Sequence, residues 1–193
     1  MLAQFMHGRT YHVSLKELLD TLAQRYATED GRNDARWLAD FLFGRLALAG
    51  VPMGDYYNPL NSSLIHVIEQ KRGIPISLAC VYVLVGDRLG FEVEGINLPG
   101  HFLAKCTGGG RSYAVDCYNG GHLLNGDDLA AVQTRIPITM QDVLNLECQS
   151  PTIIARVLRN LCNAYAQSGH EGNAHLMSDL LTMMERGNLS AQA

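Results

Sequence analysis

Apolar residues recur at helical spacing near both ends of the chain, whereas the middle carries a long apolar run and short alternating stretches. Val13 to Tyr26 places its leucines on one helical face, with Ser14 as N-cap and Glu17 three positions later, which is the pattern of a capping box. Asp34 to Leu48 repeats the helical spacing. Two N-terminal helices are therefore predicted, with their aromatic residues in the core.

The next predicted helices lead into the centre of the chain. Leu64 to Lys71 is expected to be a short helix with Asn61 or Ser62 as its N-cap. Pro75 to Arg88 is almost continuously apolar, and Pro suits the first helical turn because it has no N–H to leave unsatisfied. Arg88 in the last turn and Gly90 beyond it are stop signals. The alternative is a buried strand, but the length and these signals favour a buried helix.

Strand-like segments follow Gly90. Phe91 to Leu98, Phe102 to Cys106 and Ser112 to Cys117 are separated by Pro99-Gly100 and by the glycine-rich loop of residues 107–110. The last two segments and their loop are typical of a β-hairpin.

The register of this hairpin decides which side chains meet. If the four loop residues are unpaired, His101 lies directly opposite Asp116, Phe102 faces Val115, and Ala104 faces Tyr113. One face is then apolar, and the other presents His101 beside Asp116. A slip of one residue would place the two on opposite faces.

Two further amphipathic stretches, Thr152 to Gln167 and Asn173 to Glu185, flank the break at Ser168-Gly169. A single helical hairpin cannot bury its apolar face alone, so it must pack on the core, on the N-terminal helices or on another chain. Short helices are expected at residues 127–133 and 140–146, with the alternative that Asp127-Asp128 merely ends a loop, and no clear period is found in residues 1–12. The predicted organisation is an N-terminal helical part of the core (1–50), a central core (51–146) and a helical tail (147–193).

Composition narrows the classes of function. The 193 residues are 47% hydrophobic and 18% charged, with a net charge of −4, which argues against a general nucleic-acid binder. The five cysteines form no CxxC pair, so neither a disulfide framework nor a thiolate zinc site is indicated. No apolar stretch of membrane-spanning length and no signal-peptide pattern is present, so we expect a cytoplasmic protein without a membrane partner.

Several phrases in the middle of the chain resemble one protein family. The matching stretches are "NPLNSSL", "KRGIPISLACVY", "GINLPGHFLAK" and "VDCYNGGHLL". They are similar to the SirB family, which comprises bacterial members of the transglutaminase-like superfamily with a tetratricopeptide-type helical tail. The resemblance covers residues 56–124 strongly and the flanks weakly. It implies an α+β fold, with a papain-like core of helices on a small antiparallel sheet. An all-helical scaffold is the poorer alternative, because the hairpin signals are strong.

The superfamily uses a Cys-His-Asp triad, which can be carried over residue by residue. His101 matches the histidine and Asp116 matches the aspartate. The cysteine normally follows a Gly-x step, fifteen residues before the glycine that ends its helix. That position holds Pro75, with Gly73 in front and Gly90 behind. The resemblance therefore implies the fold, whereas Pro75 offers no side-chain nucleophile for acyl transfer.

Three other residues are weighed as replacement nucleophiles. Ser77 lies two positions along the same helix, where a serine usually satisfies N–H groups of the first turn. Cys80 and Cys117 are each expected to be small buried hydrophobic residues. His101 and Asp116 have a purely structural alternative too, as a hydrogen-bonded pair that ties the hairpin. His122 with this pair is the only conceivable metal set, but it lacks any fixed ligand spacing, so no metal or cofactor is expected.

Binding residues are predicted around the same region. Tyr56, Tyr57 and Asn58 are expected at the mouth of a pocket, since tyrosine offers a flat apolar ring and a hydroxyl; the alternative is that they simply cover the next helix. Asn97 and Asn119 flank the His and Asp positions. The leading hypothesis is a non-catalytic or regulatory protein that binds a protein or peptide through its residual cleft and tail. The alternatives are a hydrolase or acyl transferase that uses Ser77, and a helical-repeat scaffold.

Overall fold

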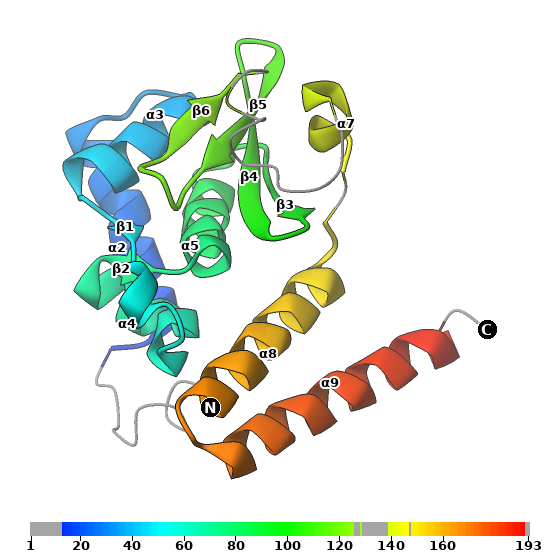
Figure 1. Ribbon diagram of the computed structural model, residues 1–193. Coiled ribbons are helices and arrows are strands. Elements are labelled where there is room, and N and C mark those ends of the chain that lie inside the picture. The colour runs from blue at the N-terminus through cyan, green and yellow to red at the C-terminus, as the bar shows by residue number, and fades with distance from the viewer. Residues whose placement is uncertain (1–12, 126–127, 129–138, 147, 192–193) are drawn as a thin grey trace.

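The computed structural model describes residues 13–125, 128, 139–146 and 148–191. Two segments discussed above lie outside the described residues. They are residues 1–12, which have no clear period, and residues 129–133, which are part of an expected short helix. The fold is α+β: a four-stranded antiparallel sheet lies beside a central helix, and further helices surround that helix (Figure 1). Within the described part of the chain, no helix combines the length and the apolar character needed to cross a bilayer.

The N-terminal helices form as the local sequence dictates, with two differences: the second helix is divided, and Trp37, predicted to lie in the core, is exposed. Helix α2, Leu15–Glu29, begins with the predicted capping box, in which Ser14 and Glu17 exchange side-chain and backbone hydrogen bonds. The second predicted helix divides into α3, Ala35–Ala39, and a π-helical segment η1, Asp40–Arg45. The wider turn of η1 accompanies three consecutive core residues, Phe41 to Phe43, that are all buried.

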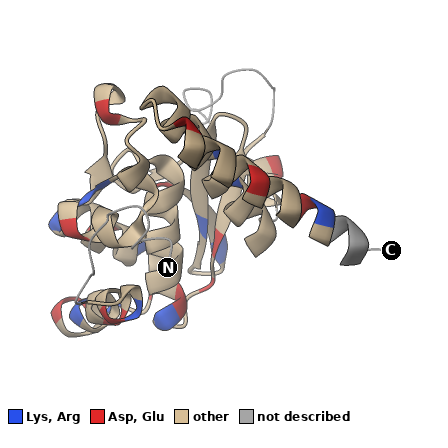
Figure 2. Cartoon of the chain, turned by 90° about the horizontal axis from the view of Figure 1, so that it is seen from below, with Lys and Arg blue, Asp and Glu red and all other residues tan. Residues whose placement is uncertain are grey.

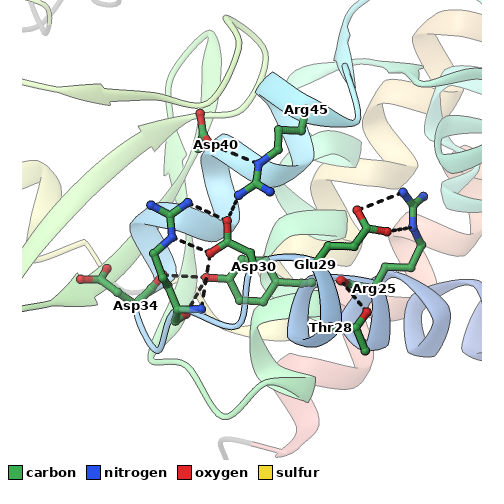
Figure 3. A network of polar contacts seen from close by, with 9 residues as sticks. Arg25, Thr28, Glu29, Asp30, Asp34, Asp40 and Arg45 are labelled. Carbon is green, nitrogen blue, oxygen red and sulfur yellow. Dashed lines mark hydrogen bonds and ion pairs between the residues drawn. The ribbon is translucent and has the colours of Figure 1, made fainter.

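A buried carboxylate fixes the link between these two helices. Asp30 is 1% exposed at its side chain and lies between the guanidinium groups of Arg32 and Arg45 (Figure 3). Arg32 donates to it at 2.5 and 2.6 Å, and the Tyr26 hydroxyl donates to the Arg32 carbonyl at 2.6 Å. Arg32 also stacks on Trp37, with its Cζ 3.7 Å from the ring centroid. This network holds the start of α3 against the end of α2.

The central helix α5, Pro75–Arg88, is the expected buried helix that begins with proline. Leu78, Ala79, Val81, Tyr82 and Val85 on it are fully buried. The short helix α4, Leu64–Gln70, precedes it. The N-cap position of α4 is Ser63, rather than Asn61 or Ser62, because residues Pro59–Ser62 form the 3₁₀ turn η3 instead. A second 3₁₀ turn, η2, spans Met53–Asp55.

The sheet has the strand order β3-β4-β5-β6, with β3 at Val93–Leu98, β4 at His101–Gly108, β5 at Arg111–Asp116 and β6 at His122–Leu124. Phe102, Ala104, Cys106, Val115 and Cys117 point into the core that contains α5. The opposite face, with Leu103 and Ala114, packs against helix α7, Met140–Leu144.

The predicted hairpin register is wrong by two residues. Ala104 faces Val115 and Cys106 faces Tyr113, because the strands continue to Gly108 and Arg111 and leave a two-residue turn. Both turn residues, Gly109 and Gly110, have positive φ (60° and 75°), as a tight primed turn requires. A shift of two preserves the faces, since side chains alternate with a period of two. His101 and Asp116 thus remain on one face, in a diagonal instead of a directly opposite arrangement.

A small parallel pairing joins distant parts of the chain. Strand β1, Ala49–Gly50, pairs with β2, Arg72–Gly73, directly before α5. Gly50 N–H also donates to the Tyr118 carbonyl at 3.1 Å, so three segments meet at Gly50.

The tail consists of α8, Ser150–Gln167, and α9, Glu171–Ala191. Helix α8 packs on the core through Ile153 and Val157, and it contacts η3, α5 and β3. Helix α9 packs along α8, through Ala174 and Met177 (Figure 1). Figure 2 shows acidic and basic residues interspersed along the ribbon of the described elements.

Candidate functional site

Asp116, the last residue of β5, is the acceptor around which the turn after the strand is built. Its carboxylate is 1% exposed and accepts hydrogen bonds from the backbone N–H groups of Tyr118 and Asn119, each at 3.2 Å. The Asn119 side-chain amide donates to the other oxygen at 2.7 Å. Asn119, predicted as a binding residue, therefore orients the carboxylate.

His101, the first residue of β4, completes this arrangement. Its Nε2 lies 3.0 Å from Asp116 Oδ1, so the predicted hydrogen-bond reach is confirmed. Because an ionised carboxylate can only accept, Nε2 is assigned as the N–H and Nδ1 as the nitrogen left for other chemistry. Among the described residues, none forms a hydrogen bond with Nδ1. A His-carboxylate pair of this kind can hold and orient a base.

The electrostatics of Asp116 follow from these bonds. Burial opposes its ionisation, but the hydrogen bond and charge of His101 and the hydrogen bonds of Asn119 together outweigh burial and lower the pKa of Asp116. The carboxylate is thus kept charged beside the imidazole.

Tyr118 forms the wall next to His101. The two rings meet edge to face, with centroids 6.3 Å apart, and the Tyr118 hydroxyl donates to the Val51 carbonyl at 2.6 Å. A Cβ at Gly50 would lie 2.5 Å from a Tyr118 ring carbon, so the ring occupies space that only glycine leaves. Tyr118 was not predicted, although it lies within the "VDCYNGG" phrase.

The start of α5 provides no nucleophile at Pro75. Ser77 is 2% exposed, and its Oγ accepts from Ile74 N–H at 3.1 Å and donates to the Ile74 carbonyl at 3.0 Å. The expectation that Ser77 satisfies its own helix end is confirmed. Among the described residues, no hydrogen bond joins Ser77 to His101. That the His101–Asp116 pair faces the start of α5 remains a prediction.

The cysteines considered as replacements lie in apolar surroundings. Cys117 is completely buried, and burial raises its pKa well above the ordinary value. Cys80 is half-buried rather than buried as predicted, yet desolvation still raises its pKa to about 12. Since the thiolate is the reactive form, neither environment activates a thiol at neutral pH.

A polar pocket of about 190 Å³ opens beside Ile74, directly before the Pro75 position. Its lining includes three of the predicted binding residues, which come from the segment between β1 and α4: Tyr56, Tyr57 and Asn58. Asn160 and Asn163 of α8 line the other side. The Tyr56 and Tyr57 rings meet edge to face, with centroids 5.4 Å apart. These three residues therefore line a pocket, and the tail helix forms part of its wall.

Arg156 of α8, one turn before Asn160, contacts the turn between β3 and β4. Its guanidinium donates to Asn97 Oδ1 at 2.5 Å and to the Leu98 carbonyl at 2.9 Å, and it reaches the His101 carbonyl at 3.4 Å. The predicted residue Asn97 is thus a partner of Arg156. No local sequence signal identifies Arg156, because its partners lie more than fifty positions away in the chain.

His122, considered from the sequence as a metal ligand together with His101 and Asp116, is not part of a metal-binding arrangement in the described residues. His122 pairs with Asp116 across β5 and β6, yet its side chain is exposed. In the described part of the chain, no group of three or more His, Cys, Asp or Glu residues is arranged to hold a metal ion.

Comparisons with known proteins agree with the sequence resemblance at the level of the superfamily. A model described as "Transglutaminase-like superfamily" matches residues 9–159. A UPF0162 protein of Xylella fastidiosa (strain 9a5c) is 34% identical over 146 residues, covering 72% of this chain and 51% of that protein. UPF0162 protein PA3419 of Pseudomonas aeruginosa is 27% identical over 190 residues, covering 92% and 66%.

A eukaryotic relative is also found. Human F-box only protein 21 is 25% identical over 151 residues, which cover 74% of this chain and 23% of that protein. This chain spans about half the length of the Xylella relative. No solved structure matches the chain.

Proposed function

Because this chain belongs to the transglutaminase-like superfamily, we propose that it is a member without acyl-transfer chemistry, whose residual site binds a peptide or protein segment. The observation that carries the proposal is at the start of α5. Pro75 stands at the nucleophile position, and the Ser77 hydroxyl is engaged at 3.0 and 3.1 Å with the backbone of Ile74. A base without a nucleophile in reach cannot form a covalent intermediate.

The pocket supports the binding part of the proposal. It adjoins the nucleophile position at Ile74, and its walls carry amide and phenol side chains. Amides both donate and accept hydrogen bonds, so they match the N–H and C=O groups of an extended peptide backbone. At about 190 Å³ the pocket is smaller than the roughly 300–1,000 Å³ of sites for drug-sized ligands. It therefore suits one or two residues of a longer segment better than a whole cofactor.

The finer features of the resemblance belong to this proposal. We assign the chain to the SirB type within the superfamily, with α8 and α9 as a tetratricopeptide-type hairpin and with a cytoplasmic location. In this scheme α8 has two roles, because Ile153 and Val157 cover the core and Asn160 and Asn163, further along the helix, line the pocket.

A hydrolase that uses Ser77, His101 and Asp116 is the second candidate. The 3.0 Å contact between His101 and Asp116, with a carboxylate of lowered pKa, favours it. The bonds of Ser77 count against it, because a serine nucleophile must be within hydrogen-bond reach of its base. The scaffold alternative has less support, because the sheet and α5 form a core of their own.

The experiment has a chemical arm and a binding arm. The chemical arm treats the protein with a fluorophosphonate and with p-nitrophenyl acetate, and we expect neither a Ser77 adduct nor turnover dependent on His101. The binding arm follows the ¹³C methyl signals of Ile74 and the side-chain amide signals of Asn160 and Asn163 while N-acetyl-trialanine amide is added. We expect the signals to shift in a saturable manner.

Two variants make the binding arm specific. Asn160→Leu removes a polar group from the pocket wall and should weaken the shifts, whereas Gln167→Leu places the same residue at an exposed position outside the lining. A Ser77 adduct that disappears in His101→Ala would establish the hydrolase instead. Peptide shifts that are absent from the pocket, or equal in both leucine variants, would refute the binding function.

A further inference from the structure

Arg156 has more hydrogen-bond donors than partners. A guanidinium carries five N–H groups in a fixed plane. Three contacts are made, to Asn97 Oδ1, to the Leu98 carbonyl and, at 3.4 Å, to the His101 carbonyl. Among the described residues no further acceptor is present, so two N–H groups of a half-buried cation remain without a protein partner.

The acceptors of Arg156 are all neutral. No described carboxylate lies within ion-pair distance of it, although Arg159, one turn further along α8, pairs with Glu185 at 2.8 Å. Asp116 is engaged with His101 and Asn119 instead. Burial lowers the pKa of Arg156. Half-buried charges are costly unless an opposite charge is near, so this arrangement favours binding of an anion.

The position of Arg156 connects it to the pocket. Arg156, Asn160 and Asn163 are spaced by four and three residues, which places them on one face of α8. Tyr56 lines the pocket and is also within range of the Arg156 charge: burial raises the pKa of Tyr56, Tyr118 adds to this effect and Arg156 opposes it. The guanidinium thus lies on the same face of α8 as the two pocket amides, next to the His101 turn.

We infer that Arg156 binds a carboxylate of the segment that occupies the pocket, so that the preferred ligand is a peptide bearing a free C-terminal carboxylate or an acidic side chain. The inference rests on the proposed function, since it names the charge of the same ligand. One guanidinium with two free N–H groups matches a planar, singly charged carboxylate, which accepts two parallel bonds. The neutral amides along α8 then match the adjoining peptide groups.

The test compares peptides that differ only in this charge. N-acetyl-trialanine is added as the free acid and as the C-terminal amide, and N-acetyl-Ala-Glu-Ala amide provides an internal carboxylate. Binding is followed by the signals of Ile74, Asn160 and Asn163 and by the Nε–H signal of Arg156. We expect the free acid or the glutamate peptide to bind at least about tenfold more tightly than the neutral amide, as a charge-assisted bond provides. The peptide that binds more tightly, the free acid or the glutamate peptide, shows whether the carboxylate comes from a C-terminus or from a side chain.

Variants separate the role of Arg156 from general charge. Arg156→Gln should abolish the preference for the acid, and Arg156→Lys, which keeps the charge and the aliphatic stem, should retain part of it. Arg159→Gln, the same change one turn away, should leave the preference intact. Equal affinity of wild-type protein for all three peptides overturns the inference but leaves the binding function standing. No binding of any peptide overturns both.

Discussion

Replacing Asp116 tests whether the turn and the histidine depend on one carboxylate. Asp116→Ala leaves four donated hydrogen bonds without an acceptor, from His101 Nε2, from Tyr118 N–H and from the backbone and side chain of Asn119. Each buried donor left unsatisfied costs roughly 1–3 kcal/mol. Asn119 is exposed and its groups can turn to water, so we expect a total loss of about 3 kcal/mol in the free energy of unfolding.

The assay is urea unfolding followed by circular dichroism, with Asp116→Asn as the intermediate variant. The amide introduced by Asp116→Asn retains an acceptor oxygen for the turn but brings an N–H₂ group toward one of the former donors, so about 1–2 kcal/mol should be lost. Asp179→Asn, at an exposed aspartate on α9, is the matched control and should change stability by less than about 0.5 kcal/mol. If Asp116→Ala loses no more free energy of unfolding than the control, the account of the turn is refuted.

The pH dependence of the same variants follows from the sign of the pKa shift. The folded protein lowers the pKa of Asp116 below its ordinary value of 3.8. The stabilisation is therefore fully present above this ordinary value and is lost as the pH falls through the lower pKa of the folded state. The difference between wild type and Asp116→Ala should be constant from pH 7 to about 5 and shrink in more acidic urea titrations. A difference that grows below about pH 4 would contradict the assignment.

Three other changes test the surroundings of the site. Gly50→Ala should displace the Tyr118 ring and cost about 1–3 kcal/mol, which a melting curve measures; an unchanged melting temperature would show that the ring yields freely. Deleting residues 150–193 removes the contacts of Ile153 and Val157 with the core, which are worth about 3–6 kcal/mol. The truncated chain should therefore melt at a lower temperature or aggregate. A soluble truncated chain of unchanged stability would show that the tail is independent of the core. Lys71→Gly should raise stability by up to about 1 kcal/mol, because Lys71 has a φ of 56°; a loss of stability would show that its side chain matters more than this backbone strain.

Features set by neighbouring residues were predictable from the sequence. The capping box of Ser14 and Glu17, the proline start of α5 and the pairing of His101 with Asp116 depend on short spacings, and each is present. The hairpin register failed because Gly108 belongs to the strand, where glycine has no side chain to signal burial.

Features set by distant residues were not predictable. Strand β6 and the β1–β2 pair are too short to show a period, and they are stabilised by partners elsewhere in the chain. Arg156 is an ordinary polar position of an amphipathic helix until α8 is placed against the turn at Leu98. The sequence therefore indicated two separate groups of candidate site residues. Only the structure shows that the tail helix connects them.

The meeting of three segments at Gly50 has a consequence for how the protein folds. Gly50 N–H bonds to Tyr118, and Ala49 and Gly50 pair with Arg72 and Gly73, so the contact closes loops of more than twenty and more than sixty residues at one point. Closing long loops costs entropy before any contact compensates for it, and non-local pairing slows folding. The helices α2 and α5 can form early from local signals, whereas the wall beside His101 must assemble late in the folding reaction. In a pulse-labelling hydrogen-exchange experiment, the Gly50 amide should become protected after the amides of α5.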